Sequence, residues 1–440
     1  MIALRGGNWN NAANTGLFAL NLNNLRSNVN TNIGFRPALL HSPILYCHWH
    51  YRLCKEKRIS IPLSCYNERN INKLASRVRV HTLKVMPADL LNNSLLGENI
   101  LPKTYNNLYS AICNFDNIYT AYINVCKNKR YHPEKLKFEN NLEENLLLIQ
   151  RLLIYKLWQP DNLKEFWVYD PKMRLIAAPS FRDRIVHHSL VQVIEPLFEN
   201  KFIYDSYACR KGKGTHAAVN RVLYYLRKTR NSYDSFYVLK CDISKYFYNI
   251  NHNILINIIK RTIRCQDTLW LIDKIIKGNK YIDISIPIGA LTSQLFANIY
   301  LNELDHYIKD VLSIKCYIRY MDDFIIIHND KEYLWYIFNL INNFIEDNLL
   351  LKLNNKSCLF KYIQGIDFCG YRIWPTHILP RKRNVYKIKR KLIKMSKLYY
   401  LNKCDLNAIK PIVMSFLGYM DHCCNHITVE HILYNLVLTK

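Results

Sequence analysis

The sequence has no run of apolar residues that reaches the roughly 18 needed for a membrane-spanning helix. Its start, Met-Ile-Ala-Leu-Arg-Gly, lacks the charged-then-apolar order of a secretory signal peptide. Its 14 cysteines lack the spacing of a disulfide framework. We therefore expect no membrane partner, reduced thiols and a cytoplasmic location.

Acidic residues are also scarce, with 34 Asp and Glu against 61 Lys and Arg, which gives a net charge of +27. Such an excess favours a polyanionic partner, and the 32 Tyr spread along the chain suit stacking on unpaired bases. A basic ribosomal-type protein or a membrane-surface protein is the alternative. The 440 residues, half of them hydrophobic, predict a sizeable core and two or three subdomains.

The stretch Cys316-Tyr-Ile-Arg-Tyr-Met-Asp-Asp-Phe-Ile-Ile-Ile-His328 predicts a hairpin with Asp322 and Asp323 at its corner. Adjacent carboxylates between apolar strands are costly unless a cation neutralises them. An isolated Asp-Asp pair is more often a solvated turn. An upstream carboxylate favours the cation site, because an apolar strand in Phe236-Tyr-Val-Leu-Lys-Cys-Asp242 delivers Asp242 at its end.

Three motifs, in this order, resemble the polymerase motifs of reverse transcriptases: Asp242 with Phe247 five residues on, Gly289 to Gln294, and Tyr-Met-Asp-Asp. The resemblance implies an α+β right-hand polymerase, whose antiparallel palm sheet is backed by helices. Residues 104–230 would be the fingers, 231–375 the palm and 376–440 the thumb. The implied reaction is RNA-templated DNA synthesis from deoxynucleoside triphosphates on a DNA primer.

The resemblance also implies the site residues. Asp242, Asp322 and Asp323 would be catalytic and, with the Ile243 carbonyl, would hold two Mg²⁺ ions. The residues implied to contact nucleotide are Arg182, Arg210, Phe247 as an aromatic gate against the ribose 2′-OH, Gly289, Gln294 and Lys356, with Lys352 an alternative to Lys356. Those implied to contact nucleic acid are Lys211, Lys213, Gly370 in a primer grip, and Arg381, Arg383, Lys387 and Arg390 in the thumb. For Lys211 and Lys213 a solvated basic loop is an equal alternative.

Two features resemble the diversity-generating retroelements. Ile288-Gly289-x-x-x-Ser293-Gln294 has the form seen in their reverse transcriptases, where intron enzymes carry Gln-Gly-x-x-x-Ser-Pro. Residues 1–36 are rich in Asn and resemble a translated template repeat, with a disordered Asn-rich extension as the alternative. The resemblance implies error-prone copying at adenines and a small basic accessory variability protein. An intron or retron enzyme, or a non-catalytic RNA-binding scaffold, remains the alternative.

Residues 37–103 are irregular and are expected to be disordered or non-native, with Met86 a plausible start and zinc at Cys47, His48, His50, Cys54 and Cys65 a minor possibility. Further along, apolar periodicity and turn signals predict the remaining elements. These are helices over 104–122, 142–158, 183–198, 252–277, 333–348 and 381–397, hairpins over 166–174 and 366–373, and a basic loop over 124–137.

Overall fold

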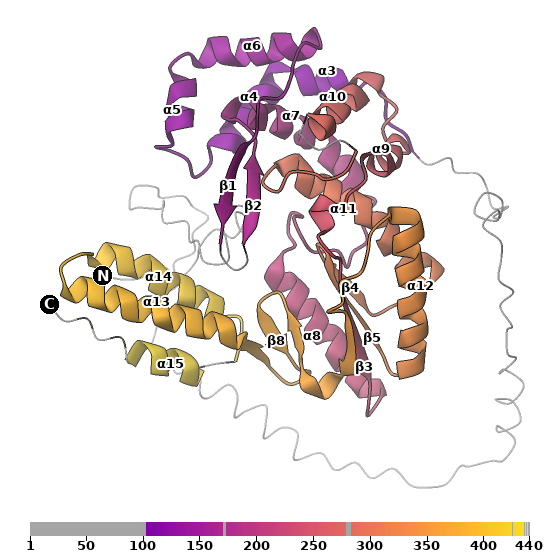
Figure 1. The fold of residues 1–440 in the computed structure, drawn as a ribbon, viewed down its shortest axis with the longest axis vertical. Coiled ribbons are helices and arrows are strands. Elements are labelled where there is room, and N and C mark those ends of the chain that lie inside the picture. Colours follow the sequence, from indigo (N-terminus) through magenta and orange to yellow (C-terminus); the bar gives the residue numbers. More distant parts are fainter. Residues whose placement is uncertain are drawn as a thin grey trace, which may run out of the picture. The chain divides into compact units, whose positions relative to one another are not determined.

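The computed structural model describes residues 103–169, 173–278, 283–424, 426–434, 436 and 438 (Figure 1). The interpretations of residues 1–36 and 37–102, including the zinc ligands and the start at Met86, lie outside these residues. Across the described ranges, no helix combines the length and the apolar character that crossing a membrane requires.

Helices make up most of the described chain. The α-helices are α3 (Tyr109–Cys113), α4 (Phe115–Cys126), α5 (Pro133–Glu139), α6 (Leu142–Ile154), α7 (Phe181–Glu199), α8 (Thr215–Ser232), α9 (His252–Lys260), α10 (Gln266–Lys277), α11 (Leu291–His306), α12 (Lys331–Leu349), α13 (Lys382–Tyr400), α14 (Leu406–Met420) and α15 (His426–Tyr434). A π-helical turn, Tyr307–Val311, extends α11, and short 3₁₀ turns cover Tyr246–Tyr248 and Tyr362–Gln364.

The strands form three antiparallel sheets. One has the order β4-β5-β3-β6, another β7-β8-β9, and the third is the ribbon β1-β2. The strands are β1 (Lys164–Val168), β2 (Arg174–Ala178), β3 (Tyr237–Asp242), β4 (Tyr317–Tyr320), β5 (Asp323–His328), β6 (Cys358–Lys361), β7 (Ile366–Phe368), β8 (Tyr371–Ile373) and β9 (Ile378–Pro380). The expected α+β class and the antiparallel sheet backed by helices are confirmed.

The four-stranded sheet buries both of its faces because its strands alternate two apolar sets. Val238 and Ile325 belong to the core shared with α8, whereas Leu239 and Ile326 belong to the core shared with α11 and α12. Figure 1 shows α8 and α12 on opposite sides of β3, β4 and β5. The sheet is thereby held rigidly, and its strand ends can present polar groups at fixed positions.

Three predicted elements differ from the structure. The single helix expected over 104–122 is two helices, α3 and α4, separated at Asn114. The basic loop expected over 124–137 contains α5, which begins at Pro133, a residue that suits the first helical position because it has no N–H to leave unpaired. The single amphipathic segment expected over 252–277 is two helices, α9 and α10, interrupted at residues 261–265. The hairpin turn expected at Tyr169-Asp-Pro-Lys172 lies mostly outside the described residues.

Candidate active site

The Asp-Asp pair occupies the connection between β4 and β5. Tyr320 pairs with Asp323, so Met321 and Asp322 form a two-residue turn, and Met321 adopts a positive φ of 57°. In the neighbouring strand Asp242 lies directly opposite Asp323 in the antiparallel register. The Ile243 N–H donates to the Asp322 carbonyl at 3.2 Å. Two segments that are far apart in sequence thus bring three carboxylates to one end of the sheet.

The charge of this corner is not balanced within the protein. Burial raises the pKa of the Asp323 carboxyl to about 7, although the nearby Lys240 ammonium lowers it and Asp242 raises it further. Asp323 Oδ1 is buried and has no hydrogen-bond partner among the described residues. Three neighbouring carboxylates with one lysine between them leave an excess of negative charge, which is an attractive position for a cation.

The donor set fits magnesium. Mg²⁺ takes one or two protein carboxylates and completes its shell with water and substrate phosphates, so it needs no closed cage of side chains. No group of three His, Cys, Asp or Glu side chains in the described residues is arranged as a preformed metal site. Asp242, Asp322 and Asp323 are the oxygen donors that the corner offers.

Asn354 supports the corner from the loop after α12. Its side-chain amide donates to Asp242 Oδ2 at 2.9 Å, and its backbone N–H donates to the Asp242 carbonyl at 2.7 Å. The sequence analysis considered only Lys352 and Lys356 in this loop. Lys356 is exposed, and its N–H donates to Asn354 Oδ1 at 3.1 Å. The same loop therefore orients one catalytic candidate and presents a lysine beside it.

A buried ion pair lies beneath the corner. The Arg319 guanidinium is fully buried and donates to both carboxylate oxygens of Asp305, at 2.7 and 2.5 Å. It also donates to the Met321 carbonyl in the turn itself, at 3.1 Å. Burial of an unpaired charge is costly, so Asp305 on α11 is what allows Arg319 to brace the turn. Sequence reasoning did not single out either residue.

A basic pocket adjoins Gly289 and Gln294. Its walls come from the end of α4, the start of α7 and the turn that leads into α11, and no carboxylate lines it. The lining residues are Asn124, Val125, Lys127, Asn128, Lys129, Pro179, Arg184, His187, His188, Gly289, Leu291 and Gln294. Burial lowers the pKa of His187 to about 3 and that of His188 to about 4. The positive side chains of the pocket are Lys127, Lys129, whose own pKa burial lowers, and Arg184, which lies 3.3 Å from Glu134.

Arg210 does not have the environment expected of a nucleotide contact. Its side chain is only 6% exposed, and its guanidinium donates to both Glu199 oxygens and to the carbonyls of Ile203 and Ser206. With its donors used in this way, Arg210 fixes the loop after α7. The expected contact of Arg210 with nucleotide stays a prediction.

Other residues predicted to contact nucleotide or nucleic acid are exposed or partly exposed. Arg182 donates to Asp161 and to the Gln159 carbonyl at the start of α7. Lys211 pairs with Glu195 at 2.8 Å, and Lys213 lies 3.4 Å from the Tyr204 ring centroid. Phe247 is partly buried and packs edge-on against Tyr246. Their proposed contacts stay predictions.

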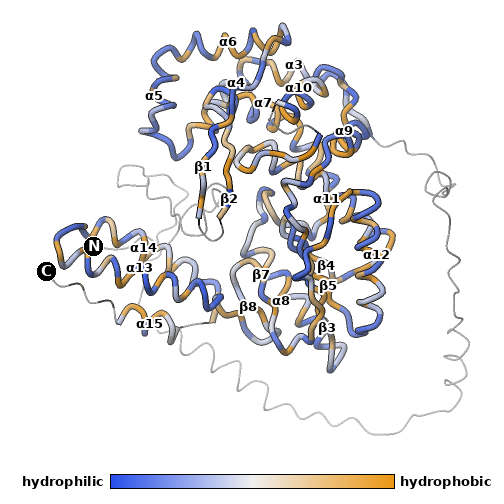
Figure 2. The backbone as a smooth tube through the Cα atoms, in the orientation of Figure 1, coloured by the Kyte–Doolittle hydropathy of each residue, from blue (hydrophilic) through white to orange (hydrophobic). Residues whose placement is uncertain are grey.

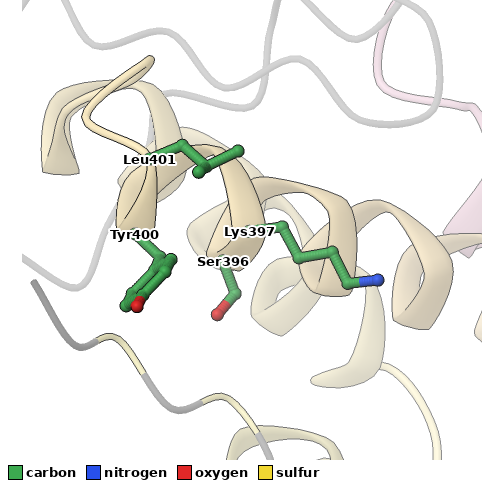
Figure 3. A pocket seen from close by; sticks show the side chains of 4 residues that line it. All are labelled: Ser396, Lys397, Tyr400 and Leu401. Atoms are coloured by element: carbon green, nitrogen blue, oxygen red, sulfur yellow. The ribbon is translucent and has the colours of Figure 1, made fainter.

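The expected primer grip is the β7-β8 hairpin, whose turn contains Gly370 at φ 90°. The Gly370 carbonyl accepts from the Arg381 N–H at 3.0 Å, which joins the hairpin to the start of α13. Arg383, Lys387 and Arg390 lie on α13. A shallow hollow near the end of that helix is lined by Ser396, Lys397, Tyr400 and Leu401 (Figure 3); it offers no carboxylate and lacks the chemistry of the corner.

Comparison with known proteins identifies the central part of the chain. Residues 168–373, or 206 of the 440, match the family model described as reverse transcriptase (RNA-dependent DNA polymerase). This range contains β3, the Asp-Asp corner and the β7-β8 hairpin. Residues 168–373 are a reverse transcriptase domain.

Relatives of this reverse transcriptase domain include intron-encoded proteins. Protein YkfC of Escherichia coli is 28% identical over 298 residues, covering 57% of this chain and 75% of that protein. The group II intron-encoded protein LtrA of Lactococcus lactis is 26% identical over 225 residues, covering 48% of this chain but only 36% of that protein. The chain therefore spans about a third of the length of the intron-encoded relative.

Among solved structures, an apo telomerase from Candida tropicalis aligns with a TM-score of 0.42 and 11% identity, covering 63% of this chain and 59% of that one. A similarity at this level carries no residue roles to the present chain. The α+β architecture described above is consistent with a right-hand polymerase.

Proposed function

We propose that the chain is an RNA-directed DNA polymerase that extends a DNA primer along an RNA template. The observation that carries the proposal is the convergence of Asp242, Asp322 and Asp323 within the reverse transcriptase domain. When bound there, two Mg²⁺ ions would stabilise the attacking and leaving oxygens of an in-line phosphoryl transfer.

The chain's own residues supply position and charge. Asn354 and the β3-β5 register fix the carboxylates, and Arg319 braces the turn that carries them. Phe247 is placed five residues after Asp242 to exclude a ribose 2′-OH, which selects deoxynucleotides. Lys356, which is exposed, would donate a proton to departing pyrophosphate. The basic pocket beside Gly289 and Gln294 offers cations to the template strand.

We further propose that the enzyme belongs to a diversity-generating retroelement and copies template adenines inaccurately. The support is local: Ile288 replaces the Gln of intron enzymes, which removes an amide that could brace the templating base. The Asn-rich residues 1–36, as a translated template repeat, point the same way. Under this assignment, a small basic accessory variability protein is a partner of the enzyme. The outcome of its activity is mutagenic retrohoming into a target gene.

The alternative is an intron or retron enzyme, and the similarity to a group II intron-encoded protein favours it. One experiment separates these possibilities. The full chain is given an RNA template, a DNA primer, deoxynucleotides and Mg²⁺, with and without the accessory protein, and the products are sequenced. Asp322→Ala serves as the inactive control, because it removes one carboxylate of the corner.

We expect incorporation by the wild type and none by Asp322→Ala. Errors concentrated opposite adenine would support the retroelement assignment, and even fidelity would favour the intron type. If the wild type incorporates no more nucleotide than Asp322→Ala, the polymerase proposal is wrong and a non-catalytic RNA-binding scaffold takes its place.

A further inference from the structure

Lys240 is a cation inside the carboxylate corner that the polymerase motifs do not account for. It stands two residues before Asp242 on β3, so the two side chains project from the same face of the sheet. Asp323, opposite Asp242, shares that face. Lys240 Nζ lies 3.2 Å from Asp323 Oδ2, with side-chain exposures of 22% and 28%.

The same ammonium has a second partner in a different sheet. Lys240 Nζ donates to the backbone carbonyl of Asp367, on β7, at 2.5 Å. The Asp367 side chain accepts from Arg381 Nε at 2.7 Å, and Arg381 immediately precedes α13. One lysine therefore joins the catalytic corner to the hairpin that carries Gly370, and through Asp367 to the start of the basic helix.

We propose that Lys240 is a positioning residue that orients Asp323 at the cation site and fixes the β7-β8 hairpin against the corner. This inference rests on the proposed function only in assigning Asp323 to that site. Lys240 engages Asp323 Oδ2, and the other oxygen, Oδ1, is the one without a hydrogen-bond partner in the described chain. The pairing thus leaves one carboxylate oxygen for a divalent cation.

Lys240 also repels the cation whose site it helps to orient. The lysine charge of +1 and a cation charge of +2 about 5 Å apart repel each other. In water at low salt this repulsion lowers the cation affinity roughly tenfold. Fixing one short side chain is worth about two- to threefold. The repulsion is the larger effect, so replacing Lys240 with Met is expected to tighten cation binding while it loosens the hairpin. The Mn²⁺ shift therefore reports how close the Lys240 charge lies to the bound cation, and the positioning of the β7-β8 hairpin needs a separate measurement.

The test is a Mn²⁺ titration of the full chain without nucleic acid, followed by electron paramagnetic resonance. We expect Lys240→Met to bind Mn²⁺ about 3- to 10-fold more tightly than the wild type. Lys240→Arg keeps the charge and is expected to stay within about twofold of the wild type.

Lys361→Met is the matched control. Lys361 ends β6 on the same sheet, is exposed, and makes no ion pair among the described residues. Hydrogen exchange provides the second measurement. Amides of Ile366–Phe368 are expected to exchange faster in Lys240→Met and at the wild-type rate in Lys361→Met.

Unchanged or weaker Mn²⁺ binding by a folded Lys240→Met protein would overturn the proposal, as would tighter binding by Lys240→Arg. If Lys240→Met does not fold, Lys240→Gln is judged by the same criterion. The titration needs no polymerase activity. A protein that shows the Mn²⁺ shift but incorporates no nucleotide would therefore refute the proposed function and leave the role of Lys240 standing.

Discussion

At the scale of single residues, the corner is held by groups that are not themselves acidic. Asn354 makes two hydrogen bonds to Asp242, one to its carboxylate and one to its carbonyl. The carboxylate bond fixes the side-chain rotamer, and the backbone bond fixes the end of β3. Catalysis by positioned groups is sensitive to displacements of about 1 Å.

We therefore expect Asn354→Ala to lower kcat/KM for single-nucleotide incorporation by about 10- to 100-fold, with unfolding little changed. Asn348→Ala is the control, because its amide contacts only the Phe344 carbonyl on the exposed side of α12. Equal incorporation by Asn354→Ala and the control would show that Asp242 keeps its position without the amide.

At the scale of elements, the turn before α11 ties the β1-β2 ribbon to that helix. The Ala177 N–H at the end of β2 donates to the Ile288 carbonyl at 2.9 Å. Gly289 follows with φ 127°, and a Cβ there would come within 2.9 Å of Ile176 Cγ2 and 3.3 Å of the Ala177 carbonyl oxygen. Only glycine meets both the dihedral and the contact.

Gly289→Ala is expected to destabilise the protein by about 1–3 kcal/mol, because it combines backbone strain with a steric clash. Gly418→Ala is the opposite case: Gly418 lies within α14, and a Cβ would meet nothing within 4 Å. That substitution is expected to stabilise by about 0.5–1 kcal/mol through helix propensity. Urea unfolding of both variants checks the pair, and a neutral Gly289→Ala would refute the packing argument.

The elements also show how far sequence reasoning reached. Alternating apolar residues in β3 and β5 were enough to place Asp242 and Asp323 at strand ends, because a two-residue period determines which side chains share a face. Asn354 and Lys240 were missed because their importance comes from contacts 112 and 127 residues away along the chain. The pairing of Arg210 with Glu199 was not foreseen, because a basic, glycine-containing loop looks the same whether its arginine is free or ion-paired.

At the scale of the whole molecule, part of the positive charge is concentrated on the helix α13. The helix Lys382–Tyr400 carries eight Lys and Arg and no acidic residue, and only Ile388 and Leu392 are buried. Figure 2 shows hydrophilic and hydrophobic residues interleaved along it. A helix with this charge pattern repels itself unless phosphates neutralise it, so its proposed partner is the template–primer backbone.

Replacing Arg383, Lys387 and Arg390 with Gln is expected to weaken template–primer binding for every sequence tested and to make its salt dependence shallower. Each lost phosphate contact reduces the slope of log K against log salt by about 0.9 on a duplex, so three give a change of about 2 to 3. Binding measured by fluorescence anisotropy over a range of salt concentrations gives the slope.

The matched variant removes three exposed lysines elsewhere, Lys260, Lys331 and Lys361, and therefore loses the same net charge. If only contacts matter, the control keeps the wild-type slope; equal slopes in the two variants would mean that the charge of +27 acts diffusely and that α13 is not the binding surface.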